Sequence, residues 1–187
     1  MQPIRRLAKI LQTLASDRSL LLAHEDLRCA VPEISDGAFR VMLSRAVSSG
    51  VLERVCRGLY RYGRPGQSDG LLLYHAAARL RASTFNYISL ESVLSDAGVI
   101  SQVLPNWVTI MSSGRSATIA CGHYGNVEFV HTHKRPNDRV ADLTYDRRCG
   151  LWRASVGRAI SDMKATRRSL DLVDWSEVDD AVRPVGR

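Results

Sequence analysis

The chain has 187 residues, 45% of them hydrophobic, and carries 26 Lys and Arg against 19 Asp and Glu, a formal net charge of +7. This length and composition exclude a disordered chain and allow one large domain or two small ones. No run approaches the roughly 18 apolar residues of a membrane-spanning helix, and the N-terminal stretch lacks the apolar core and cleavage site of a secretory signal.

The excess positive charge lies mainly in the first third of the chain. Residues 1–68 hold 11 basic and 6 acidic residues (+5), whereas residues 69–187 hold 15 and 13 (+2). A clustered basic surface is typical of proteins that bind phosphate groups. The four cysteines are widely spaced, without a C-x-x-C pair, so we expect free thiols in a reducing, cytoplasmic compartment.

Three short elements are predicted ahead of residue 35. Hydrophobic spacing predicts a helix over 4–14, a short extended stretch over 20–22 and a second helix over 24–30, with a break at 16–19. Three basic residues of the first helix either contact phosphate or are simply solvated: Arg5, Arg6 and Lys9.

The most informative stretch begins at residue 35 with a third predicted helix. Ser35 or Asp36 caps its N-terminus, and Gly50 follows its end, where a positive φ costs little. One stripe of this helix is apolar and predicted to be buried: Phe39, Met42 or Leu43, and Ala46. The polar residues off that stripe point toward solvent or a partner: Arg40, Ser44, Arg45 and Ser48.

A β-hairpin is predicted directly after this helix. Residues 51–55 and 59–62 are rich in strand formers and flank the turn Cys56-Arg57-Gly58. A basic helix followed by a basic hairpin is typical of a winged helix-turn-helix, which places the helix in the major groove of DNA. We therefore predict a winged helix-turn-helix DNA-binding domain over residues 1–64. The alternative is a solvated charged helix beside an ordinary hairpin.

Seven residues are the candidate DNA contacts. Three on the helix are expected to reach base edges, because arginine pairs bidentately with guanine; they are Arg40, Ser44 and Arg45. Ser48, on the same side of the helix, is a further candidate. Those on the hairpin are expected to contact phosphate or the minor groove; they are Arg54, Arg57 and Arg61.

A mixed α+β domain is predicted over residues 65–187, after a linker at 64–70 that is rich in turn formers. Its predicted helices cover 71–81, 90–97 with Ser89 as N-cap and Gly98 as stop, 155–168, and a short stretch around Trp175. Strand-like runs cover 107–111, 117–121 and 127–131, with a further strand at 150–154. The spacing of the first three runs predicts an antiparallel β-meander flanked by helices.

Motifs for metal binding or catalysis are weak. Cys121-x-His123 and His131-x-His133 would supply four zinc ligands if two adjacent strands brought them together. This spacing is less specific than an established zinc motif, so we expect solvent-facing or hydrogen-bonded side chains there. The chain has no GxSxG, GxxxxGKS or GxGxxG motif. We expect no enzyme activity, no catalytic residues, no metal and no cofactor.

The order of several weak motifs resembles the AbiEi family of antitoxins. Arg57-Gly58-Leu59-Tyr60 looks like the end of an antitoxin winged helix, and residues 87–94 with Gly98 resemble the family's Y-I-S-x-x-S-x-L-x-x-x-G-L helix, with Val99 in place of the last Leu. Residues 107–111 and 127–131 resemble the strands that follow. Ala159-Ile160-Ser161-Asp162 resembles the late R-A-x-x-D helix.

The resemblance implies a bacterial antitoxin and transcriptional repressor from an abortive-infection (phage-defence) operon. Such proteins bind inverted repeats in the double-stranded DNA of their own promoter, and their second domain opposes a nucleotidyltransferase-type toxin, often without a stable complex. The alternatives are a stand-alone winged-helix regulator, a protein-interaction module that binds an acidic partner, and a nuclease or nucleotidyltransferase in the second half. The last alternative lacks an acidic metal cluster in the sequence.

Overall fold

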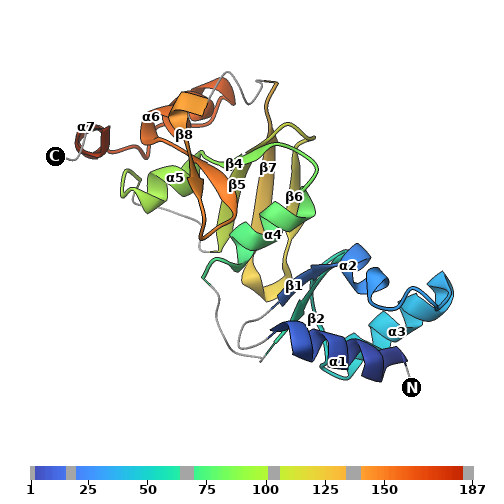
Figure 1. Cartoon of the computed structure of the whole chain (residues 1–187). Coiled ribbons are helices and arrows are strands. Elements are labelled where there is room, and N and C mark those ends of the chain that lie inside the picture. Colours follow the sequence, from blue (N-terminus) through green and yellow to red (C-terminus); the bar gives the residue numbers. More distant parts are fainter. Residues whose placement is uncertain (1–2, 16–19, 64–69, 101–105, 134–139, 183–187) are drawn as a thin grey trace. The chain divides into compact units, whose positions relative to one another are not determined.

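A computed structural model describes the chain over residues 3–15, 20–63, 70–100, 106–133 and 140–182 (Figure 1). The described residues form an α+β protein with two separate sheets. The chain divides into two compact units, Met1–Gly70 and Leu71–Arg187. The break predicted at 16–19 and residues 64–69 of the predicted linker lie outside the described residues.

The first unit alternates helices and strands. Its elements in chain order are α1 (Pro3–Ala15), β1 (Leu20–Ala23), α2 (His24–Cys29), α3 (Asp36–Ser48), β2 (Glu53–Cys56) and β3 (Leu59–Tyr62). The strands form an antiparallel sheet in the order β1-β3-β2. All the helices and strands predicted for this segment are present, although β2 begins two residues later than expected.

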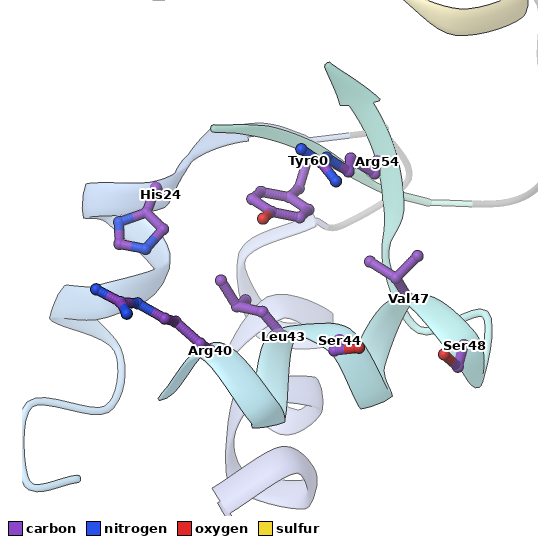
Figure 2. A pocket seen from close by; sticks show the side chains of 8 residues that line it. All are labelled: His24, Arg40, Leu43, Ser44, Val47, Ser48, Arg54 and Tyr60. Carbon is purple, nitrogen blue, oxygen red and sulfur yellow. The ribbon is translucent and has the colours of Figure 1, made fainter. Parts of the chain in front are cut away.

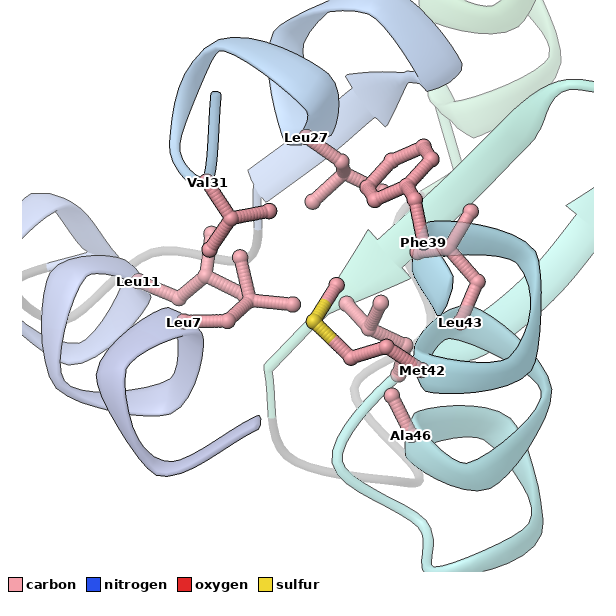
Figure 3. Packing of buried hydrophobic residues seen from close by; sticks show 9 residues of the cluster. Leu7, Leu11, Leu27, Val31, Phe39, Met42, Leu43 and Ala46 are labelled. Atoms are coloured by element: carbon pink, nitrogen blue, oxygen red, sulfur yellow. The ribbon is translucent and has the colours of Figure 1, made fainter. Parts of the chain in front are cut away.

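The three helices of this unit share one apolar core (Figure 3). The predicted stripe of α3 is confirmed, and both alternatives at its centre are buried. α1 contributes Leu7 and Leu11, while Leu27 comes from α2. Full burial of each such side chain stabilises the fold by about 1.5–3 kcal/mol. The core therefore fixes α3 firmly and leaves its opposite side exposed.

The second unit is built on a six-stranded mixed sheet in the order β6-β7-β5-β4-β9-β8. Its strands are β4 (Asn86–Ile88), β5 (Trp107–Ser112), β6 (Ala117–Ala120), β7 (Asn126–His131), β8 (Leu143–Asp146) and β9 (Leu151–Ala154). Its helices are α4 (Leu72–Leu80), α5 (Glu91–Asp96), α6 (Val156–Ala165), α7 (Trp175–Val182) and the 3-10 turns η1 (Gly122–Tyr124) and η3 (Val140–Asp142). The sequence did not predict β8.

The predicted antiparallel meander is wrong. β7 lies between β5 and β6, and it pairs in parallel with β5 and antiparallel with β6. The physical reason lies in the burial of the strands. β7 carries the fully buried Val127 and Phe129, which favours a central position, whereas the mostly exposed residues of β6 suit an edge strand.

Helices cover both faces of this sheet. Arg81, directly after α4, stacks over the ring of Phe129 with 4.0 Å between its guanidinium carbon and the ring centroid, and donates to Ser112 Oγ. On β5, Thr109 Oγ1 instead lies 3.2 Å from Ser92 Oγ of α5. Because residues 109 and 112 point to opposite faces of the strand, α4 and α5 lie on opposite faces.

Ser89 does not cap α5, contrary to the prediction. The helix begins after Leu90, whose φ is 58°, and the buried Ser89 hydroxyl donates to Asp162 Oδ2 at 2.9 Å. The Tyr87 hydroxyl donates to the same oxygen at 2.9 Å, and Arg158 donates to Oδ1 through Nη2 at 2.7 Å. These residues belong to the Y-I-S and R-A-x-x-D motifs. The two motifs thus meet at one buried carboxylate.

The remaining helices follow the prediction closely. Ser155 caps α6 by accepting a hydrogen bond from Arg158 N, and α6 ends three residues before the predicted limit. α7 occupies the stretch predicted around Trp175. Among the helices that the structure describes, none combines the length and apolar character needed to cross a lipid bilayer.

Candidate nucleic-acid interface

A hollow of about 300 Å³ lies between α3 and the β2–β3 hairpin (Figure 2). We call it the α3–hairpin hollow. It is lined by His24, Arg40, Leu43, Ser44, Val47, Ser48, Arg54 and Tyr60. Figure 2 shows Arg40 reaching from α3 toward His24, whereas Arg54 and Tyr60 come from the hairpin.

The turn between α2 and α3 is held by Arg28. Its Nη1 and Nη2 donate to the carbonyls of Val31 and Ile34 at 2.7 and 2.8 Å, and its Nε lies 3.4 Å from Asp36 Oδ1. Ser35 caps α3 by accepting a hydrogen bond from Ala38 N at 3.3 Å, which selects one of the two predicted caps. The direction of α3 is therefore set by side-chain bonds at its start.

The hairpin is fastened to α2. The backbone N–H of His24 donates to the carbonyl of Gly58 at 2.9 Å, and Gly58 takes a φ of +80° in the turn. On the paired strands Arg54 lies opposite Tyr60, so both side chains point to the sheet face that carries the hollow. This register brings a charged and a phenolic group to face α3.

The hollow is rich in hydrogen-bond donors and positive charge. Arg40 and Arg54 bring guanidinium groups, each with five N–H donors, and Ser44, Ser48 and Tyr60 bring hydroxyls. Such a set suits an anionic oxygen, above all a phosphate, because guanidinium–phosphate hydrogen bonds are charge-assisted.

The charge on this side of the unit is not neutralised internally. Within the described part of the unit, three arginines have carboxylate partners: Arg6 with Glu33, Arg28 with Asp36 and Arg61 with Glu53. Among the residues that the structure describes, Arg40, Arg45 and Arg57 form no ion pair. Their charge is available to a polyanion.

The structure brings four of the seven predicted contacts together in the hollow, namely Arg40, Ser44, Ser48 and Arg54. Arg45 is exposed but lies toward α1, beside Pro3 and Ile4. Arg57 is exposed at the hairpin turn, outside the residues that line the hollow. Six of the seven predicted contacts therefore lie in three places: the hollow, the side of α3 toward α1, and the hairpin turn.

Arg61 does not lie on this surface. Its side chain is only 4% exposed, and its Nη1 lies 4.0 Å from Glu53 Oε2. Arg61 follows Tyr60 on β3, and because neighbouring strand residues point to opposite faces, it points away from the hollow. Its position therefore differs from that of the other two predicted wing residues, and its contact with DNA stays a prediction. The alternation of side chains along the strand was the signal that separates Arg61 from Arg54.

Two residues of the hollow were missed by sequence reasoning. His24 stands at the start of α2 and packs edge-on against the Phe39 ring, with the centroids 5.0 Å apart. Tyr60 was interpreted as a strand former and as part of the Arg57-Gly58-Leu59-Tyr60 motif, but not as a site residue. No local pattern marks either residue, because each reaches the hollow through the packing of α2 and β3 against α3.

The residues considered for zinc do not form one cluster. Cys121 is buried, whereas His131 Nε2 lies 3.2 Å from His133 Nδ1, and its Nδ1 lies 2.8 Å from the Gly114 carbonyl oxygen. His123 packs against the ring of Tyr124 instead. Within the described ranges, no three His, Cys, Asp or Glu side chains are grouped to hold a metal ion.

Residues 30–63 match the family model described as transcriptional regulator, AbiEi antitoxin. The match confirms the predicted resemblance over the stretch that runs from the end of α2 to the end of β3. It includes every residue that lines the α3–hairpin hollow except His24. The matched family is one of regulators. Among curated proteins, none matches the chain.

Proposed function

We propose that residues 1–64 form a winged helix-turn-helix that binds double-stranded DNA in the promoter of its own operon and represses transcription. α3 enters the major groove, and the β2–β3 hairpin serves as the wing. The observation that carries this proposal is the α3–hairpin hollow, where Arg40 on the helix and Arg54 on the hairpin line one space.

The order of elements supports this arrangement. A helix in the major groove and a hairpin beside it must straddle the phosphate backbone that separates two grooves. In this proposal the hollow holds that backbone, and its lining of guanidinium and hydroxyl groups matches the chemistry of a phosphodiester.

The three parts of the surface have different roles in this proposal. Arg40, Ser48 and Arg54 hold the backbone in the hollow, with Ser44 between them and the bases. Arg45 reaches a guanine edge or the second strand from the other side of α3. Arg57, at the tip of the wing, contacts flanking phosphate.

We further propose that residues 65–187 act as the antitoxin part and counteract a nucleotidyltransferase-type toxin without enzyme activity of their own. The support is the resemblance of motifs in this segment to the AbiEi family. Tyr87, Ser89 and Asp162 of those motifs are buried, so in this proposal they maintain the fold. The groups that oppose the toxin are then exposed residues outside the motifs.

Fluorescence anisotropy with labelled promoter duplex tests the DNA-binding part. The full chain should bind the promoter more tightly than a scrambled duplex. The logarithm of the binding constant should fall linearly with the logarithm of salt concentration between about 50 and 200 mM, with a slope of about −0.9 per phosphate neutralised. Equal affinity for both duplexes would contradict sequence-specific repression.

A growth assay tests the antitoxin part separately. Coexpression of the full chain should restore growth of cells that express the nucleotidyltransferase of the same operon. The variant with both Arg40→Ala and Arg54→Ala should restore growth equally, because those residues serve DNA alone. Specific DNA binding without rescue would leave a stand-alone regulator. Rescue with a stoichiometric partner and no DNA binding would favour the protein-interaction module.

A further inference from the structure

The exposed side of α3 has a centre and two flanks. At about 100° per residue, the buried residues Phe39, Met42, Leu43 and Ala46 define one direction across the helix, and the opposite direction is its apex. The residues that lie within about 30° of the apex are Gly37, Val41, Ser44 and Ser48. Arg40 and Arg45 lie about 70° from the apex on opposite sides.

Val41 is the only branched apolar side chain at this apex. It is 51% exposed, and its neighbours along the apex, Gly37 and Ser44, are small. Gly37 has no side chain, and a Cβ built there would meet no atom within 4 Å. The other neighbour is Ser44. The two methyl groups of Val41 therefore stand above the surface that α3 would press into a groove.

The charge around Val41 indicates the partner. Arg40 and Arg45 flank it, are exposed and form no ion pair with another described residue. Two cations beside one exposed valine fit a surface that has anionic edges and an apolar point between them. The major groove of DNA is such a surface, because phosphates border it and thymine displays a C5-methyl group on its floor.

We propose that Val41 is a specificity-determining residue that recognises a thymine through contact with its C5-methyl group. This inference rests on the proposed DNA-binding function and adds to it a base and a chemical group. The contact is made by dispersion and by removal of apolar surface from water, so it needs no hydrogen bond.

A protein partner is the competing occupant. Val41 also borders a groove of about 430 Å³ between α1 and α3, together with Ile4, Ile34 and Met42. An apolar segment of a protein would fill that groove, but it would leave the charges of Arg40 and Arg45 without partners. The flanking charges therefore favour DNA.

Single-position replacement of thymine by deoxyuridine tests the proposal, because it removes only the methyl group. The full chain is titrated with promoter duplexes that each carry one replacement, at fixed salt. At one thymine per half-site, the wild-type chain should lose about fourfold in affinity, as expected for one methyl group buried. Val41→Ala should bind the thymine duplex about fourfold more weakly and show no further loss at that position.

Leu14→Ala provides the matched control. Leu14 is also exposed, at 60%, but lies on α1. This variant should keep the wild-type response to deoxyuridine. Circular dichroism should give the same helix content for all three proteins, because Val41 lies outside the core.

Each outcome has a definite meaning. Equal deoxyuridine penalties in wild type and Val41→Ala would overturn the thymine contact while specific promoter binding stands. A Val41→Ala variant with unchanged DNA affinity and weaker self-association, measured by analytical ultracentrifugation, would assign the residue to a protein interface and overturn the proposal. Absence of specific promoter binding in the wild type would overturn the proposed function itself.

Discussion

Selected arginines of the two units lie in different surroundings. In the first unit Arg40, Arg45 and Arg57 are exposed and form no ion pair with any described residue. In the second unit Arg158 is bound to the buried Asp162, with Nη2 2.7 Å from Oδ1. Arginine therefore carries exposed charge without an ion pair at these three positions, whereas Arg158 binds a carboxylate in the interior of the second unit.

Other arginines of the second unit repeat this pattern. Arg153 Nη1 lies 2.6 Å from Asp96 Oδ2, and its Nε lies 3.3 Å from Asp146 Oδ2. Arg168 joins Glu91 of α5 at 2.7 Å and also pairs with Glu128 of β7. Among the described residues each unit has three arginines with a carboxylate partner, so the difference of the two halves, +5 against +2, comes from composition and not from pairing.

Asp162→Ala is expected to have the largest effect, because it leaves the Arg158 guanidinium without its buried partner. The free energy of unfolding of the second unit should fall by about 3–5 kcal/mol. All three tryptophans lie after residue 70, so tryptophan fluorescence in a urea titration reports on this unit. Ser161→Ala, at the exposed neighbouring position, is the control. A loss under about 1 kcal/mol would show that the Arg158–Asp162 pair does not stabilise the second unit.

The double variant Arg40→Ala with Arg54→Ala removes both arginines of the hollow. It should weaken DNA binding and leave the stability of the chain almost unchanged. We expect DNA affinity to fall by about 2–4 kcal/mol, and the salt slope to decrease in magnitude by about 2, since each contact neutralises one phosphate. The free energy of unfolding should change by no more than about 0.5 kcal/mol. Anisotropy and urea titrations give both numbers. An unchanged salt slope would place the phosphate contacts elsewhere.

Arg57 and Arg61 sharpen the comparison within one hairpin. Arg57→Ala should reduce the salt slope by about 1 without loss of stability. Arg61→Ala should lower the free energy of unfolding of the first unit by about 1–2 kcal/mol, because the buried side chain and its ion pair with Glu53 are lost.

Hydrogen exchange of the first-unit amides measures the stability difference, and anisotropy measures the salt slope. Arg61→Ala should leave the salt slope unchanged. A decrease in that slope would return Arg61 to the DNA surface and contradict the burial seen in the structure.

A further effect is expected at alkaline pH. Burial, together with the neighbouring Asp146, raises the pKa of the Cys149 thiol to about 11. The pKa of a thiol in an unfolded chain is about 8.5. Above about pH 8.5 the Cys149 thiol of the unfolded chain loses its proton, whereas the thiol of the folded chain keeps it. The contribution of Cys149 to stability is therefore complete below pH 8.5 and is lost as the pH rises through 11.

Tryptophan fluorescence in urea at pH 8, 9, 10 and 11 follows this loss, and Cys149→Ser should flatten it. Burial and then Asp96 raise the pKa of Tyr74 to about 12, so a second decline should begin above pH 10.

At pH 8, iodoacetamide should modify the exposed Cys29 of the first unit long before Cys149. Equal alkylation rates would contradict the burial of Cys149.

Local sequence patterns predicted the first unit well because its structure depends on near neighbours. The spacing from Phe39 to Ala46, the Ser35 cap and Gly50 all lie within one helix and its ends. The sequence analysis treated three arginines of the hairpin as equivalent, although Arg61 is buried in the structure. The alternation of strand side chains, with Tyr60 packed toward the helices, separates them.

The second unit was harder to predict because its order depends on distant partners. Nothing near Ser89 in the sequence reveals that its hydroxyl meets Asp162, 73 residues further on. The position of β7 between β5 and β6 likewise depends on which strands pair, and no pattern within a single strand gives this order. His24 and Tyr60 entered the hollow for the same reason, through packing between elements rather than through a local motif.

The bonds of Asp162 to Tyr87 and Ser89 also set an order of events during synthesis. The first unit draws its core from residues before 63 and can close as soon as they leave the ribosome. Tyr87 and Ser89 of the second unit can bond to Asp162 only after α6 has been made. At about 5–20 residues per second, the ribosome completes α6 about 5–20 s after it completes the first unit. A nascent chain therefore holds a finished α3–hairpin hollow while the rest of the molecule is still being made.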